Sequence, residues 1–244
     1  MQSGPFLTAA LAVGAISALS AAPHVTSGEV AAKRLLATTQ HAALAQGSVQ
    51  AQVSGTSGGG GFVETVVCDL RSGYADISLK RTHGTGKVRL VGGALYAKGA
   101  STALETLLNL PATPPKQLVD RWFVVPPSLP TYSAAAAGLT LPTLLDDAMP
   151  ALAGGSARTQ VRLANGVHLN GIATTRLQVT VSGIGATVQA TLYVSTQHSH
   201  LPIEFISTVG GTVISEIRFD KWRVPVRLTK PSHPQRPNRS ELLK

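Results

Sequence analysis

The chain is poor in cysteine, in acidic residues and in aromatic residues. Its 244 residues include one cysteine, 12 Asp and Glu side chains and 5% aromatic residues. A single cysteine excludes an internal disulfide and a cysteine-rich metal site. Cys68 follows Val66 and Val67 in an apolar run. We therefore expect a buried strand position for Cys68 rather than a nucleophile, which would need a basic partner beside it.

The sparse acidic residues form no clustered set for acid–base catalysis. Asp146 and Asp147 are adjacent, and neighbouring side chains of a helix point about 100° apart, so these two cannot face each other across a substrate. The Gly-x-Ser-x-Gly elbow of serine hydrolases is also missing from the sequence. We predict that the protein is not an enzyme.

Two other motifs come close to known ligand sites without completing them. The 84–87 segment, Gly-Thr-Gly-Lys, has the ending of a phosphate-binding loop, but Arg81 stands where the first glycine belongs. His198 and His200, together with Glu204, could hold a metal ion. A polar turn between two strands explains the same residues, and we favour the turn. The prediction is that the protein has no metal and no cofactor.

The net charge of +9 and the isoelectric point near 10.1 leave two interpretations open. Either the surface has an anionic partner, or it is basic without a dedicated one. The Lys and Arg residues are scattered along the chain and are not interleaved with aromatic residues, as stacking on a single strand of nucleic acid would require. We therefore predict no nucleic-acid binding.

The first 22 residues form the longest apolar stretch. Residues 6–19 are almost all apolar or small, and residues 18–22 offer small side chains for cleavage. This predicts a signal peptide, and hence an extracytoplasmic protein, although no Lys or Arg precedes the apolar run. An uncleaved N-terminal membrane segment and a buried helix of the domain are the alternatives, the helix being the least favoured.

Alternating apolar and polar residues predict an antiparallel sheet of about ten strands. One strand–turn–strand pattern occurs twice, over 87–98 and over 191–206, and Gly92-Gly93 in the first copy suits a two-residue hairpin. The dipeptides Asn165-Gly166 and Asn170-Gly171 predict two further hairpin turns.

A leucine-rich, proline-bounded insertion interrupts the predicted sheet. Leucines at helical spacing predict a helix over 103–110 and another that starts near Leu141, with Thr140 as its cap and Pro142 in its first turn. A further helix is expected over 30–44. The domain is expected to span 27–229, and residues 230–244, basic and rich in proline, are expected to form a disordered tail.

The order of several short motifs resembles that of the actinobacterial LppX/LprG lipoproteins, which are similar to the carriers LolA and LolB. The motifs are Val53-Ser54-Gly55, Val88 to Gly99, Asp120-Arg121-Trp122, Asn170-Gly171-Ile172, Leu192 to Ser195, Leu201-Pro202-Ile203, and Phe219 with Trp222 before Pro225. The resemblance implies an α+β fold: an unclosed antiparallel half-barrel wrapped around a helical plug. It also implies an apolar cavity that carries lipids or acylated molecules, and no catalytic residues. The lipobox cysteine of that family has no counterpart before Cys68.

The combination predicts a monomeric, extracytoplasmic lipid carrier with an acyl chain as its ligand. The envisaged partners are a membrane surface or envelope transport proteins. The alternative is an envelope interaction, sensor or assembly domain with a sealed core. Strand parity and the inserted leucines predict the cavity lining: Val88, Leu90, Leu95, Leu104, Leu107, Leu108, Leu141, Leu144, Leu145, Leu192, Val194, Ile203 and Phe205.

Overall fold

The computed structural model describes residues 27–57, 60–81, 83–108, 110, 114–149, 159–182, 187–197 and 199–242. The predicted signal segment, residues 1–22, lies outside these ranges. Among the residues described, no helix is both long enough and apolar enough to cross a membrane.

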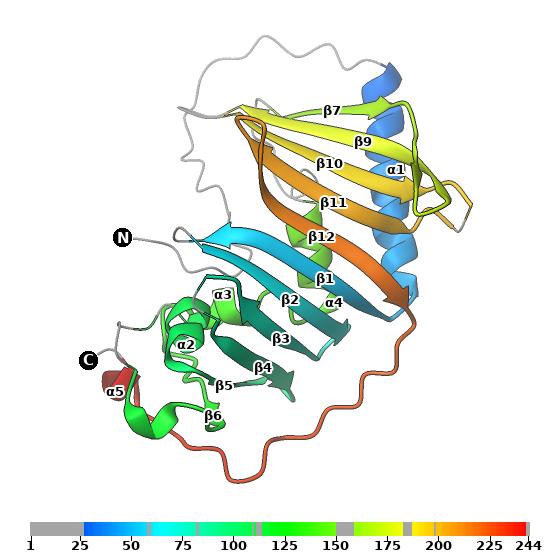
Figure 1. Cartoon of the computed structure of the whole chain (residues 1–244). Coiled ribbons are helices and arrows are strands. Elements are labelled where there is room, and N and C mark those ends of the chain that lie inside the picture. The colour runs from blue at the N-terminus through cyan, green and yellow to red at the C-terminus, as the bar shows by residue number, and fades with distance from the viewer. Residues whose placement is uncertain are drawn as a thin grey trace, which may run out of the picture.

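One antiparallel sheet of 12 strands dominates the molecule (Figure 1). The order of pairing is β6-β5-β4-β3-β2-β1-β12-β11-β10-β9-β7, with β8 paired to β9. Because β6 and β7 are at opposite edges, the sheet stays open, as predicted. Ten strands have six residues or more, and the two additional ones have two residues each. The strands are β1 Ser48–Ser57, β2 Gly60–Asp69, β3 Gly73–Leu79, β4 Thr85–Val91, β5 Ala94–Gly99, β6 Phe123–Val124, β7 Thr159–Ala164, β8 His168–Leu169, β9 Ile172–Ser182, β10 Thr187–Ser195, β11 Pro202–Val209 and β12 Thr212–Trp222.

The two copies of the strand–turn–strand pattern form the β4–β5 and β10–β11 hairpins. In the first, Val91 pairs with Ala94, and Gly92 and Gly93 have φ of +57° and +76°, in the left-handed region that favours glycine. In the second, Leu192 pairs with Phe205. Both hairpins confirm the strand prediction.

Only one of the two predicted Asn-Gly turns closes a hairpin. Asn170 and Gly171 have positive φ and join β8 to β9. The prediction for Asn165-Gly166 is wrong, because β7 pairs with β9 across a longer loop that contains β8. The Asn165 carbonyl accepts a hydrogen bond from Arg176 Nε at 2.6 Å, which holds this loop against β9.

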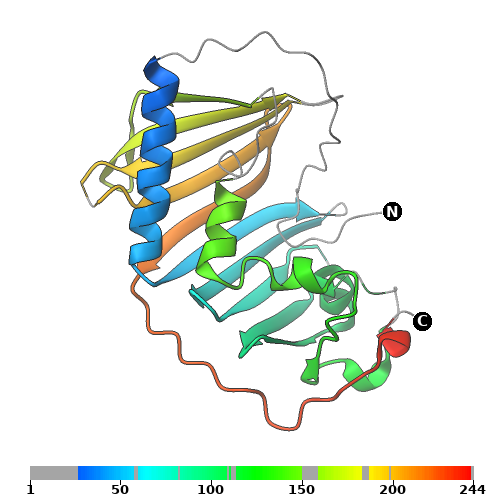
Figure 2. The same cartoon turned by 180° about the vertical axis from the view of Figure 1, so that it is seen from behind.

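Helices lie on one side of the sheet, which Figure 2 shows from behind. The elements are α1 Ser27–Ala45, α2 Ser101–Leu108, the 3-10 turn η1 Lys116–Leu118, α3 Tyr132–Ala136, α4 Leu141–Ala148 and α5 Arg239–Leu242. Helix α1 packs against β7 and α4, and α2 packs against β3, β4, β5 and α3. The insertion therefore occupies the concave side, as the plug prediction required.

Helix α4 begins where the sequence indicated. The Thr143 N–H donates to the Thr140 hydroxyl at 3.4 Å, and Pro142 lies in the first turn, where its missing N–H is not needed. Just before α4, Leu139 lies against the inner face of β3: a Cβ added to Gly73 would collide with the Leu139 carbonyl oxygen. Likewise, a Cβ at Gly86 of β4 would come within 2.6 Å of Leu107 in α2. Glycine on the sheet lets the insertion approach closely.

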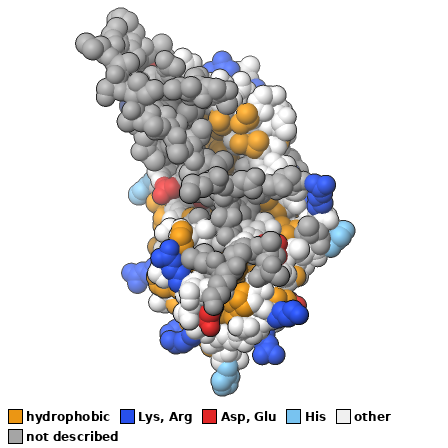
Figure 3. All heavy atoms as spheres, turned by 90° about the vertical axis from the view of Figure 1, so that its left-hand side faces the viewer, with side chains coloured by type: hydrophobic (Ala, Val, Ile, Leu, Met, Phe, Trp, Pro, Cys, Tyr) orange, Lys and Arg blue, Asp and Glu red, His pale blue; other side chains and the backbone are white. Residues whose placement is uncertain are grey.

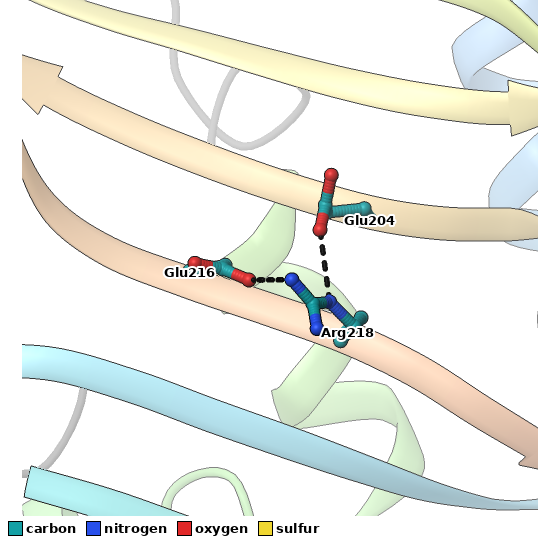
Figure 4. A network of polar contacts seen from close by, with 3 residues as sticks. All are labelled: Glu204, Glu216 and Arg218. Carbon is teal, nitrogen blue, oxygen red and sulfur yellow. Dashed lines mark hydrogen bonds and ion pairs between the residues drawn. The ribbon is translucent and has the colours of Figure 1, made fainter. Parts of the chain in front are cut away.

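The outer face of the sheet is polar. Glu204 on β11 and Arg218 on β12 are directly paired, and Arg218 Nε donates to Glu204 Oε1 at 3.0 Å. Arg218 Nη2 also contacts Glu216 at 2.7 Å, and Figure 4 shows the three side chains on the side away from α4. These interactions raise the pKa of the arginine further. The network stabilises the convex side and leaves the concave side apolar.

The C-terminal segment differs from the predicted disordered tail. Residues 223–238 run below the sheet from the end of β12 to β6 (Figure 1), and we call them the strap. The Gln235 N–H donates to the Trp122 carbonyl, and the Gln235 carbonyl accepts from the Val124 N–H, each at 2.9 Å. Leu242 then enters the core, with 1% of its surface exposed. Because the strap's backbone groups and Leu242 find partners on β6 and in the core, its low apolar content does not prevent ordering.

Candidate functional site

The inner face of the sheet is a continuous apolar surface. Pairing carries one row of side chains across eight strands: Gly86, Ile77, Glu64, Val53, Ile217, Phe205, Leu192 and Leu177. Seven members of this row are apolar or glycine, and the exception is Glu64. The concave face is thus the place where an apolar ligand, or a sealed core, can be built.

Most of the predicted lining residues lie in one buried cluster. Twelve of the thirteen belong to the hydrophobic core that joins the inner face to the helices: Val88, Leu90, Leu95, Leu104, Leu107, Leu108, Leu141, Leu144, Leu145, Leu192, Val194 and Phe205. Within the cluster, the insertion leucines 104, 108, 141, 144 and 145 have no exposed surface. The α2 leucines pack over β3, β4 and β5, and α4 packs against α1.

Ile203 does not pair as predicted. The β10–β11 register passes from Tyr193 opposite Glu204 to Val194 opposite Pro202, so Ile203 is the extra residue of a β-bulge. Pro202 takes the buried position across from Val194, and Ile203 is half-buried. Parity counted from Phe205 fails at this point because a bulge shifts the alternation by one residue.

A less tightly covered patch lies on the inner face of β9, β10 and β11. Ala190 pairs with Val179 on one side and Ser207 on the other, and each of the three is 8% exposed. The plug leucines, by contrast, are completely covered. The sequence offered only strand alternation here, which shows that residues share a face but not how tightly that face is covered.

Glu64 is a buried carboxyl that the sequence-based list of site residues did not include. It is 4% exposed, and its cross-strand neighbours on the inner face are Val53 and Ile77. Burial raises its pKa to about 8, and no other cause contributes. Strand parity was a usable signal, since it places Glu64 on the same face of β2 as Phe62 and Val66.

A second carboxyl is partly buried on α4. Burial, helped by the neighbouring Asp146, raises the pKa of Asp147 to about 7, and its Oδ2 has no hydrogen-bond donor among the described residues. Asp146 is exposed and accepts a hydrogen bond from Gln40 of α1 at 3.3 Å. The two adjacent aspartates therefore have different environments, in agreement with their expected divergence on a helix.

Trp222 lies at the end of the inner face. A bulge at Asp220 brings both Phe219 and Trp222 to the concave side, where the rings stack with centroids 5.5 Å apart. The indole Nε1 is buried, and the described residues offer it no acceptor. Trp122 lies elsewhere, with the Arg89 guanidinium 4.7 Å from its ring centroid. Both tryptophans act as packing anchors.

The remaining candidate groups are inert or outside the described ranges. Cys68 is buried on β2, and burial together with Asp69 raises the pKa of its thiol to about 12, which suppresses the reactive thiolate. His198 lies outside the described residues, and Glu204 is bound to Arg218. Within the described part of the chain, no three His, Cys, Asp or Glu side chains are grouped as metal ligands would be.

A solved structure shares this arrangement. LprF from Mycobacterium bovis matches with a TM-score of 0.51 and 13% identity, over 84% of this chain and 99% of LprF. The chain has the LprF fold. The lipoprotein LppX from Mycobacterium tuberculosis matches with a TM-score of 0.49 and 16% identity, over 81% of this chain and 99% of LppX. No protein-family model and no curated protein matches the sequence.

Proposed function

We propose that the protein is a non-enzymatic, extracytoplasmic carrier that binds a lipid or acylated molecule at the concave face of its sheet. The observation that supports this most is the continuous apolar inner face, eight strands wide at the level of Val53, covered by a Leu-rich insertion instead of a second sheet. The LprF fold agrees with such a role, and the protein would act as a monomer.

The energetics favour an acyl chain as the ligand. Each CH₂ group that leaves water contributes about 0.8 kcal/mol, so a sixteen-carbon chain gains on the order of 10 kcal/mol before ordering costs. We place the chain over the patch formed by Val179, Ala190 and Ser207, because these side chains retain exposed surface whereas the plug leucines do not.

The distribution of charge suits a protein that takes up its lipid from a membrane surface. Residues 223–242 contain five basic side chains and one acidic side chain, a net +4 out of the +9 of the whole chain. Figure 3 shows basic side chains around the edge of the lower half of this face, and hydrophobic side chains both between them and in the upper half. A basic surface beside an apolar one suits contact with anionic headgroups during lipid exchange.

Binding of a fluorescent acyl probe tests the proposal. Ala190→Trp fills the patch from the inner face, so the variant should lose most of the affinity for the probe with a small change in Tm. Gln189→Trp is the matched control, since the neighbouring residue points to the outer face and is exposed. Solvent extraction of the purified protein followed by mass spectrometry should reveal co-purified lipid. The sealed-core alternative gains support if wild type binds no probe and yields no lipid.

A further inference from the structure

Glu64 is a buried polar group on the same inner face as the patch of Val179, Ala190 and Ser207, and its strand, β2, is three strands from β11. Strand β2 is fifth among the eleven strands of the pairing path, and Glu64 is in its middle. Its neighbours on the same face are apolar in all four directions: Val53 and Ile77 across the strands, Phe62 and Val66 along β2. Such surroundings are typical of an apolar side chain.

The described residues give this carboxyl no hydrogen bond and no ion pair. Desolvation is the single cause of its altered pKa, whereas a hydrogen-bond donor or a nearby cation would have lowered it. A buried carboxyl without a partner costs stability even when it is protonated, on the order of 1–3 kcal/mol. The protein's other buried carboxyl near the sheet, Glu204, is paired with Arg218. The contrast leaves the Glu64 carboxyl without a partner among the described residues and able to bind a ligand group.

We propose that the Glu64 carboxyl is an internal hydrogen-bonding anchor for the ligand, and that the ligand is a lipid with a neutral hydroxyl or amide on its apolar part. This inference rests on the proposed lipid-binding function and narrows its ligand class. A neutral carboxyl both donates and accepts, so it matches a hydroxyl or amide, and apolar surroundings strengthen the bond. The absence of any charged neighbour on the inner-face row favours a neutral partner over an ionic one.

The test compares two probes that differ in one group: stearate and 12-hydroxystearate, each competing with the fluorescent acyl probe. Wild type should prefer the hydroxylated chain about five- to tenfold, the value of one hydrogen bond to a desolvated group. Glu64→Gln keeps a donor and an acceptor and should retain the preference. Glu64→Leu should abolish it and bind stearate at least as tightly as wild type does.

Glu204→Gln is the matched control, because it alters a buried glutamate of the opposite face and should leave the ratio unchanged. Equal binding of both probes by wild type, or an unchanged ratio in Glu64→Leu, overturns the anchor while the carrier function stands. Failure of wild type to bind either probe contradicts the carrier function itself. A further outcome is that a chain carrying an amine binds more tightly than 12-hydroxystearate, with the difference lost in Glu64→Gln. That result would show that the partner of Glu64 is cationic and not neutral.

Discussion

At the scale of single residues, the environment of a side chain decides its chemistry more than its type does. Glu64 and Glu204 are both buried glutamates of the same sheet. The first faces the apolar side and has a strongly raised pKa, and the second is bound to Arg218 on the polar side. The direction in which each side chain leaves its strand separates a destabilising group from a stabilising one.

Glu64 should make the stability of the protein depend on pH. The pKa of Glu64 is about 8 in the folded state and 4.5 when exposed, so between these values the folded state keeps a proton that the unfolded state releases. The free energy of unfolding is therefore highest below pH 4.5. As the pH rises towards 8, the free energy of unfolding should fall by an amount on the order of 3–5 kcal/mol. Urea unfolding at a series of pH values should show this decline.

Glu64→Leu should remove about half of the decline seen in wild type, because Asp147 has a raised pKa of similar origin. Asp147, whose pKa is raised to about 7, leaves a smaller slope with the same sign between its ordinary value of 3.8 and pH 7. Glu216→Gln, at an outer-face position, is the control and should behave like wild type. A pH profile that is identical in wild type and Glu64→Leu would show that Glu64 is not desolvated.

At the scale of elements, the strap connects the two ends of the N-terminal half of the sheet. It starts beside β1, where the Arg223 N–H donates to the Ser48 carbonyl at 3.0 Å and the Ser48 hydroxyl donates to the Val224 carbonyl at 2.7 Å. It ends on β6, a two-residue edge strand, with Gln235 hydrogen-bonded on both sides of Phe123. Covering an edge strand in this way also hides its free backbone groups from other chains.

The contact that follows the strap, made by Leu242 of α5, should be worth a measurable amount of stability. Leu242 is 1% exposed and follows Asn238, whose side chain accepts from the Glu241 N–H at 3.0 Å and caps α5. Leu242→Ala should lower the free energy of unfolding by about 2–4 kcal/mol in urea titrations. Arg239→Ala, one turn earlier and exposed, should change it by less than about 0.5 kcal/mol. Equal, small effects of both variants would indicate a strap that is not docked.

At the scale of the whole molecule, the two faces of the sheet and the strap differ in polarity. The concave face is apolar, the convex face has the Glu204–Arg218–Glu216 network, and the strap concentrates positive charge below the sheet. A molecule built in this way can approach an anionic surface with the strap while its apolar layer stays covered.

Binding to vesicles should therefore depend on the strap and on salt. Co-sedimentation with vesicles that contain phosphatidylglycerol should exceed that with pure phosphatidylcholine, and it should fall steeply from about 50 mM to about 500 mM NaCl as screening increases. Reversing three exposed strap charges (Arg227→Glu, Lys230→Glu and Arg236→Glu) should abolish the preference for anionic vesicles. Each basic side chain removed should cost about 1 kcal/mol of binding free energy.

The matched control reverses three exposed charges away from the strap: Arg34→Glu, Lys80→Glu and Arg162→Glu. It alters the net charge by the same amount, so it should retain most of the binding to anionic vesicles if the strap is the contact surface. Equal loss in the two triple variants would mean that net charge alone, and no particular surface, attracts the protein.

The sequence by itself determined the strands, most hairpin turns and the sidedness of the sheet. Alternation and Gly-Gly or Asn-Gly pairs are local signals, because the pleat and the positive φ of a tight turn act on neighbouring residues only. They correctly placed Leu95 and Leu192 on the inner face. The same local logic predicted the start of α4 from Thr140 and Pro142.

The tertiary structure alone decided which polar groups are buried, where alternation breaks, and where the C-terminal segment docks. Glu64 becomes a desolvated carboxyl because three other strands align Ile77, Val53 and Ile217 in its row, and the parity of β2 alone does not show this cover. Ile203 lost its place to Pro202 through a bulge, and the strap gained order from an edge strand about 110 positions earlier in the chain. Desolvation and docking depend on what covers a residue, and segments distant in the sequence provide that cover.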